Sequence, residues 1–108
     1  MAAGYEVQVV VVSGDDKGKR WVLVPTIDYD IGRNADNRIV LADKTVSKRH
    51  SLIQFVDGIW FVQDLGSRHG TFVNEEQVSE RKALFDKDII RIGKTTMVYG
   101  HVRRGKPT

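Results

Sequence analysis

The dipeptide Asp57-Gly58, which separates two strand-length segments near the middle of the chain, constrains the fold more than any other feature. Residues 50–56 and 59–64 on either side are rich in β-branched and aromatic residues, which favour strands. Asp-Gly supplies the positive φ angles that the two-residue type I′ turn of a β-hairpin needs. The sequence therefore predicts an antiparallel hairpin here.

Further short segments of strand character occur along the rest of the chain, separated by polar turns. We expect strands at residues 5–12, 20–24, 27–31, 39–41, 72–73, 77–78, 88–92 and 95–99. Residues 75–85 contain several helix-favouring residue types, but their apolar residues lack helical spacing, so we expect strand and turn there. Many short strands without a convincing helix indicate an all-β sandwich or barrel.

Length and composition narrow the class of protein further. The 108 residues suit one domain with a single core, which we place at residues 1–100, followed by a basic tail or linker at 101–108. The chain contains no run of 18 apolar residues and no secretory signal, so we expect neither a membrane span nor export. Cysteine is absent, which excludes disulfides, thiolate metal sites and a cysteine nucleophile and fits a cytoplasmic protein, or a nuclear one in a eukaryote.

The positive charge is unevenly distributed. The net charge is +3, but residues 101–108 hold three of the 17 Lys and Arg residues and none of the 14 acidic ones, so the remainder is formally neutral. A uniformly basic face for nucleic acid is therefore not expected. Within the body, cations gather in two polar segments, a pattern that suits one small anion better than a long polyanion; these cations are Arg33, Arg38, Lys44, Lys48, Arg49 and Arg68.

Three loops carry the candidate binding residues, since a β-sandwich places its functional residues on loops at one end. Gly32-Arg33 directly follows a strand, and the guanidinium group of Arg33 has five donors suited to phosphate oxygens. Ser47 adds a hydroxyl and a backbone N–H beside the cation Lys48. The third loop, residues 65–70, offers flexible backbone and another guanidinium group.

Together these motifs resemble the forkhead-associated (FHA) domain. Gly32-Arg33, then Ser47-x-x-His50, then Asp64-Leu65-Gly66-Ser67-x-x-Gly70-Thr71 occur in the order and spacing of that family, and Asp88-x-Ile90-x-Ile92-Gly93 is similar to its closing strand pattern. The resemblance extends from about residue 5 to residue 99. It implies a β-sandwich of about eleven strands whose end loops bind a phosphothreonine peptide.

The resemblance also implies roles for individual residues. By matching position, Arg33, Ser47 and Lys48 would bind the phosphate. Loops near Thr45 and Arg68 would contact the peptide, together with His69, which occupies the position of the family's peptide-binding asparagine. The positions expected to brace the loops structurally are Gly32, His50 and Gly70.

Three positions depart from the family pattern. His69 replaces an asparagine, and an imidazole could preserve the peptide contact, weaken it or, when protonated, add positive charge. Glu75 stands where glycine often follows Asn74, and Lys87 stands where glycine commonly precedes Asp88. We expect Glu75 to affect local geometry only, and we expect no functional effect from Lys87.

Other classes of function fit the sequence less well. Ser47, His50 and Asp64 supply the residue types of a hydrolase triad, but no Gly-x-Ser-x-Gly motif accompanies them. The histidines lack metal-ligand spacing, and we expect neither a metal nor a cofactor. The aromatic residues lie within strand patterns and are expected in the core, which argues against base stacking on nucleic acid.

The sequence therefore predicts a non-enzymatic module that binds phosphothreonine proteins in Ser/Thr kinase signalling, with a kinase acting upstream or as the ligand itself. The alternative is an FHA-like scaffold or dimerisation domain whose phosphate recognition is weak or lost.

Overall fold

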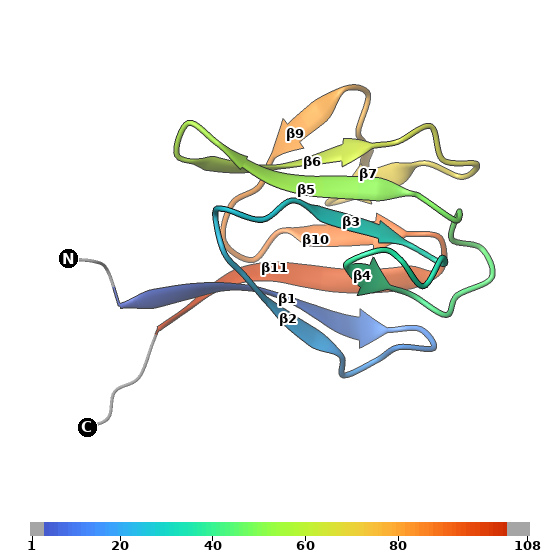
Figure 1. Cartoon of the computed structure of the whole chain (residues 1–108), viewed down its shortest axis with the longest axis horizontal. Coiled ribbons are helices and arrows are strands. Elements are labelled where there is room, and N and C mark those ends of the chain that lie inside the picture. Colours follow the sequence, from blue (N-terminus) through green and yellow to red (C-terminus); the bar gives the residue numbers. More distant parts are fainter. Residues whose placement is uncertain (1–3, 104–108) are drawn as a thin grey trace.

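Eleven strands in two sheets form a β-sandwich in the computed structural model, which describes residues 4–103 (Figure 1). One sheet has the order β2 (Arg20–Leu23), β1 (Tyr5–Ser13), β11 (Thr95–Arg103), β10 (Ile89–Ile92), β7 (Thr71–Val73) and β8 (Glu76–Gln77). The other has the order β4 (Ile39–Val40), β3 (Tyr29–Gly32), β5 (Ser51–Val56), β6 (Ile59–Asp64) and β9 (Arg81–Ala83). The expected all-β sandwich is confirmed.

The β5–β6 hairpin forms as expected. Val56 pairs with Ile59, and the intervening Asp57 and Gly58 have φ angles of 51° and 85°, both in the region that a type I′ turn requires. The segment 75–85 also contains strand and turn rather than helix, as expected. Within it, β8 pairs in one sheet and β9 in the other.

Some boundaries differ from the expectation. Strand β3 begins at Tyr29 rather than two residues earlier, and β9 was not foreseen as a separate strand. Strand β11 continues through Arg103, which pairs with Tyr5 of β1, so three residues assigned to the tail lie in the sheet. The rest of that tail, residues 104–108, lies outside the described residues. Within residues 4–103, no helix is long and apolar enough to cross a membrane.

Alternate residues of the strands from both sheets form the core. Ile31, Ile53 and Val62 of one sheet are fully buried opposite Ile90 and Met97 of the other. Fully burying such a side chain contributes about 1.5–3 kcal/mol. The core therefore fixes where every strand ends, and hence where the loops lie.

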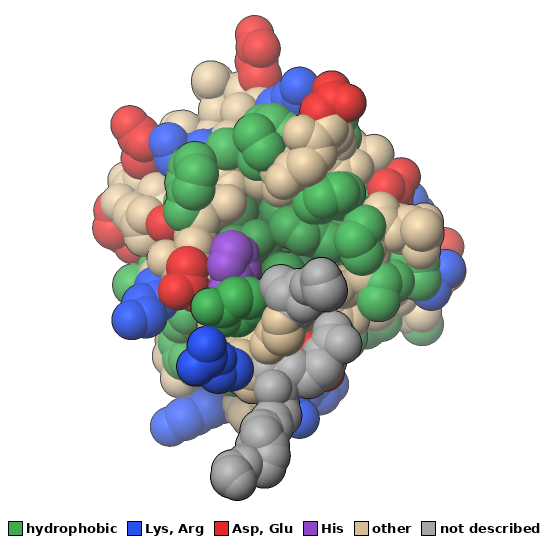
Figure 2. Space-filling view, turned by 90° about the vertical axis from the view of Figure 1, so that its left-hand side faces the viewer, with side chains coloured by type: hydrophobic (Ala, Val, Ile, Leu, Met, Phe, Trp, Pro, Cys, Tyr) green, Lys and Arg blue, Asp and Glu red, His purple; other side chains and the backbone are tan. Residues whose placement is uncertain are grey.

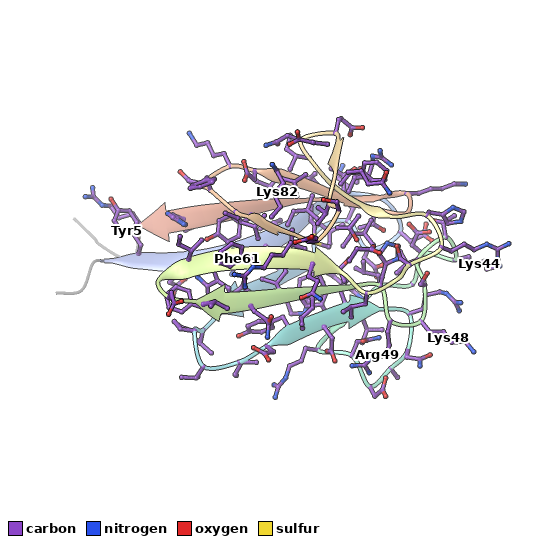
Figure 3. The ribbon with its side chains drawn as sticks, turned by 90° about the horizontal axis from the view of Figure 1, so that it is seen from above. Tyr5, Lys44, Lys48, Arg49, Phe61 and Lys82 are labelled. Atoms are coloured by element: carbon purple, nitrogen blue, oxygen red, sulfur yellow. The ribbon has the colours of Figure 1, made fainter. Side chains whose placement is uncertain are left out.

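The connections β3–β4, β4–β5 and β6–β7 lie at one end of the sandwich, at the right in Figure 1, and the start of β1 and the end of β11 lie at the other. Figure 2 shows that other end, where hydrophobic side chains gather in the middle of the face. The cations Lys44, Lys48 and Arg49 extend outward at the loop end, opposite Tyr5 (Figure 3). The two ends of the molecule therefore differ in chemical character.

Candidate functional site

An open pocket of about 400 Å³ lies among the three loops at the cationic end. The structure brings together there the six residues to which the sequence analysis assigned phosphate or peptide binding: Arg33, Thr45, Ser47, Lys48, Arg68 and His69. Lys44 and Arg49 add two more cationic side chains to the lining. The pocket is therefore strongly positive in a domain whose body is formally neutral.

Arg33 is held in place by the neighbouring loop. Its backbone N–H donates to the carbonyl of Ser47 at 3.1 Å, and its side-chain Nε donates to the carbonyl of Val46 at 2.6 Å. The Nε bond fixes the direction of the side chain while leaving the two terminal nitrogens to donate elsewhere. An exposed guanidinium group oriented in this way can bind an anion with two parallel hydrogen bonds.

Ser47 lines the pocket and connects two of its loops. The Ser47 Oγ accepts a hydrogen bond from the backbone N–H of Arg68 at 3.0 Å, which joins the β4–β5 and β6–β7 connections. Because the oxygen accepts this bond, its own O–H remains available to donate to a bound anion. The Ser47 backbone is also fixed, since its N–H donates to His50.

His50 is fully buried and connects two loops. Its Nδ1 accepts the Ser47 N–H at 3.0 Å, and its Nε2 lies 2.8 Å from the carbonyl of Gly70. Since a carbonyl can only accept, Nε2 carries the proton and Nδ1 does not, which identifies the neutral tautomer. Burial lowers the pKa of His50, against the opposing effects of the Gly70 hydrogen bond and the charge of Asp64.

Gly32 is required by close packing and not by an unusual backbone angle. Gly32 is the last residue of β3, and its φ is not positive. A Cβ at this position would overlap the carbonyl of Lys48 and lie 2.7 Å from Nδ2 of Asn37. The absent side chain therefore allows the β4–β5 connection to pass directly against β3.

Asn37 and Asp43 organise the loops, and the sequence analysis did not single out either. Buried Asn37 donates from Nδ2 to the carbonyls of Asn34 and Lys48 at 2.9 and 2.7 Å. Buried Asp43 accepts hydrogen bonds from the backbone and hydroxyl of Thr45 and from the backbone N–H of Lys94. The Asp43-x-Thr45 spacing, which is typical of an Asx turn, was the available signal.

Thr45 has little hydrogen-bonding capacity left for a ligand. Its hydroxyl donates to Asp43 and accepts from the backbone N–H of Lys94 at 2.9 Å. Burial alone would raise the pKa of Asp43, but the hydrogen bonds from Thr45, Thr95 and Lys94 outweigh burial and lower it. Asp43 is therefore a charged acceptor at pH 7, and Thr45 is oriented by it.

Asp64 organises the third loop in a similar way. Its carboxylate accepts from the backbone N–H groups of Gly66 and Ser67 and from the hydroxyls of Ser67 and Thr71. Burial alone would raise the pKa of Asp64, but these hydrogen bonds from Ser67 and Thr71 lower it. Asp64 is thereby committed to the loop backbone, and its described hydrogen bonds do not include His50. The residue types of a hydrolase triad are present without its geometry.

The backbone at the end of this loop depends on Gly70. This buried glycine has a φ of 88°, its N–H donates to Ser67 Oγ at 2.8 Å, and its carbonyl meets His50. His69 and Arg68, which precede it, are both exposed. Gly70 therefore fixes the backbone at the end of this loop. The guanidinium group of Arg68 and the imidazole of His69, just before it, line the pocket.

A second hollow of about 390 Å³ adjoins the pocket and shares Thr45 and His69 with it. Its further lining comes from Phe72, Arg91, Gly93 and Lys94. The guanidinium carbon of Arg91 lies 4.1 Å from the centre of the Phe72 ring, which gives one wall an aromatic face with a cation above it. The two hollows together can accommodate an anionic group and a neighbouring side chain of one ligand.

Comparison with known proteins connects this arrangement to a family. The family model for the FHA domain matches residues 29–93, which include all three loops. The glycogen accumulation regulator GarA of Mycolicibacterium smegmatis is 39% identical over 92 residues, covering 84% of this chain and 56% of the relative. The chain therefore spans about half the length of this relative.

Two solved structures are similar over nearly the whole chain. An FHA domain studied for phosphothreonine-dependent interactions has a TM-score of 0.78 at 30% identity, covering 95% of this chain and 99% of that one. The solution structure of an FHA domain from Arabidopsis thaliana has a TM-score of 0.83 at 27% identity, covering 100% of this chain and 96% of that one. The likeness thus includes the sandwich and the loop end.

Proposed function

The chain belongs to the FHA domain family of phosphothreonine-dependent interaction modules, and we propose that the pocket around Arg33, Ser47 and Lys48 holds the phosphate of a phosphothreonine partner. We therefore assign the chain a binding role and no enzymatic one. The observation that carries the proposal is the fixed orientation of Arg33, whose Nε is bonded to Val46 while its terminal nitrogens remain available.

The chemistry of the pocket fits a phosphate dianion. Phosphothreonine carries a charge of about −1.5 to −2 near pH 7 and three acceptor oxygens. Arg33, Lys48 and Arg68 supply cations, and the Ser47 hydroxyl supplies a neutral donor. Hydrogen bonds to charged groups contribute about 1.5–3 kcal/mol each, and after the costs of association and peptide ordering we expect a Kd on the order of micromolar.

The remaining peptide contacts involve Arg68, His69 and the adjoining hollow. We place the backbone beside the phosphothreonine against His69, and a flanking side chain of the peptide in the hollow near Thr45 and Phe72. The partner is a phosphorylated protein in Ser/Thr kinase signalling, with the kinase as the enzyme that writes the mark or as the ligand. The cytoplasmic location, the separate basic tail and the absence of a nucleic-acid ligand stay predictions.

The test is calorimetric titration with a degenerate phosphothreonine peptide pool and its phosphoserine and unphosphorylated counterparts. Wild-type protein is expected to bind only the phosphothreonine pool. Arg33→Ala should abolish binding, and Ser47→Ala should weaken it about tenfold or more, since each removes a charge-assisted hydrogen bond from an exposed loop. Arg103→Ala, on β11 at the other end, is the control and should bind as wild type.

Unchanged affinity in Arg33→Ala would overturn the assignment. If no pool binds, the scaffold alternative with lost phosphate recognition is favoured, and His69→Asn becomes the first variant to restore the family's residue. A melting curve for each variant separates loss of binding from loss of the fold.

A further inference from the structure

A second basic groove lies on the flank of the sandwich, outside the phosphate pocket. Its volume is about 340 Å³, and it is lined by Lys19, Arg20, Trp21, Arg38 and Val40. Strand β2 is the last strand of one sheet and β4 the last strand of the other, so the groove takes its lining from edge strands of both sheets. None of these five residues lines the phosphate pocket.

Two guanidinium groups in this groove have no carboxylate partner. Arg20 and Arg38 are exposed, and no ion pair among residues 4–103 includes either of them. The acidic residue bonded to the backbone of Arg38 is Asp30, which already pairs with Arg49 at 2.9 Å. The groove therefore has positive charge that the domain itself does not neutralise.

The edge of β2 in this groove has room for another strand. The carbonyl of Lys19 accepts a hydrogen bond from the backbone N–H of Val11 in β1. Successive residues of an antiparallel strand point their backbone N–H and C=O groups alternately toward and away from the neighbouring strand, so those of Arg20 and Val22 point away from β1. The hydroxyl of Tyr29 accepts the N–H of Val24 at 2.8 Å and donates to the carbonyl of Val22 at 3.5 Å, so it occupies the far end of this edge. The end at Arg20 is left to pair with an extended segment from outside.

Trp21 adds an apolar wall. It is half-buried and packs against the core, and it also lines the groove together with the two arginines. An indole in this position can contact an aliphatic or aromatic side chain, and it can stack on a guanidinium group. The groove thus combines backbone pairing, an apolar contact and two separated cations.

The lining favours carboxylates over a second phosphate. The phosphate pocket has the Ser47 hydroxyl beside its cations, whereas the groove lining includes no hydroxyl side chain. Arg20 lies on β2, and Arg38 directly precedes β4 of the other sheet, so they suit two carboxylates spaced along a chain better than one compact dianion.

We propose that the groove between β2 and β4 docks an extended acidic segment, rich in Asp or Glu, of the phosphorylated partner. Only the identity of the partner rests on the proposed phosphothreonine function. Arg38 follows Arg33 within the same β3–β4 connection, so this one loop contributes a lining residue to both the groove and the phosphate pocket. A single partner can then occupy both, with the acidic segment raising affinity beyond that of the phosphothreonine alone.

NMR titration with an unphosphorylated peptide of four glutamates around one tyrosine tests the groove directly. Amide signals of Arg20, Val22 and Val40 and the indole signal of Trp21 are expected to shift, and to shift equally in Arg33→Ala. In the Arg20→Ala/Arg38→Ala double variant the peptide should bind about tenfold more weakly, since two charge-assisted contacts are lost. An Arg103→Ala/Lys87→Ala double variant removes the same charge elsewhere and should titrate as wild type.

Several outcomes would overturn the proposal: no shifts, shifts confined to the phosphate-binding loops, or equal affinity in the groove variant. Tighter binding there of inorganic phosphate, oligothymidylate or anionic vesicles would replace the acidic segment with another ligand. The two proposals fail separately, because loss of phosphothreonine binding leaves the glutamate titration unchanged, and a failed glutamate titration leaves Arg33 and phosphothreonine binding unchanged.

Discussion

The Nδ1 atom of His50 accepts a hydrogen bond from the backbone N–H of Ser47 at 3.0 Å, and this bond fixes the loop that carries the Ser47 hydroxyl. The same ring reaches the carbonyl of Gly70 through Nε2, so one buried side chain holds two binding loops in register. His50 does not line the pocket. Its contribution to binding is therefore expected to come from positioning Ser47 and the loop that carries His69.

Replacing His50 with alanine should lower both stability and binding. The substitution leaves a cavity and removes the partners of the Ser47 N–H and the Gly70 carbonyl, which should cost about 3–4 kcal/mol in the free energy of unfolding. Urea denaturation measures this loss, and peptide titration below the transition measures binding. Ser47→Ala is the matched variant: it should weaken binding with a much smaller change in stability. Equal stability of His50→Ala and wild type would contradict the bridging role.

The neutral state of His50 predicts a pH dependence of stability. Its pKa in the folded protein is below the ordinary value of 6.5, so the unfolded chain takes up this proton first as the pH falls. The contribution is complete above about pH 6.5 and is lost progressively as the pH falls from there toward the lowered pKa. Urea midpoints measured between pH 8 and 5 should decline, and the decline should be smaller in His50→Gln.

The carboxylates of Asp43 and Asp64 make the stability depend on pH in a separate, more acidic range. Hydrogen bonds hold their pKa values below the ordinary one, so their contribution to stability is present above about pH 4 and is lost as the pH falls through their lowered pKa values. Asp43→Asn and Asp64→Asn should each flatten the stability profile below pH 4. A profile that stays flat in the wild type across this range would contradict these assignments.

The contact between Gly32 and Lys48 predicts that Gly32→Ala is destabilising even though the backbone angle at this position is ordinary. A methyl group would overlap the Lys48 carbonyl, so the β4–β5 connection must move, at a cost of about 3 kcal/mol. Phosphopeptide affinity should fall as well, since Ser47 lies on the displaced segment. Chemical denaturation and titration give the two values. Gly58→Ala, at a turn where an added Cβ would meet nothing within 4 Å, is the control that tests backbone angle alone and should leave binding intact.

The hairpin at Asp57-Gly58, the strand pattern and the three loop motifs were predictable because they depend on local backbone preferences and on spacing along the chain. The buried contacts of Asn37 and Asp43 were not predictable, since they join loops that only the folded sandwich brings together. Gly32 shows the same limit: a glycine in sequence does not reveal whether an angle or a neighbour requires it. The groove at β2 and β4 depends on which strands end their sheets, and sequence order alone does not give that information.

Lys87 provides a test of local strain, because it is a non-glycine residue with a φ of 76° in the connection before β10. A side chain in this left-handed region costs about 1 kcal/mol, so Lys87→Gly should raise the free energy of unfolding by roughly that amount. The backbone N–H of Lys87 donates to the Tyr99 carbonyl at 2.8 Å, a bond that glycine retains.

Lys87→Ala separates the two effects of the substitution, since it removes the charge but keeps the Cβ, and it should show no gain in the urea midpoint. If alanine and glycine stabilise the protein equally, the gain comes from the lost charge and not from relieved backbone strain. Phosphopeptide affinity should be unchanged in both variants, because Lys87 does not line the pocket.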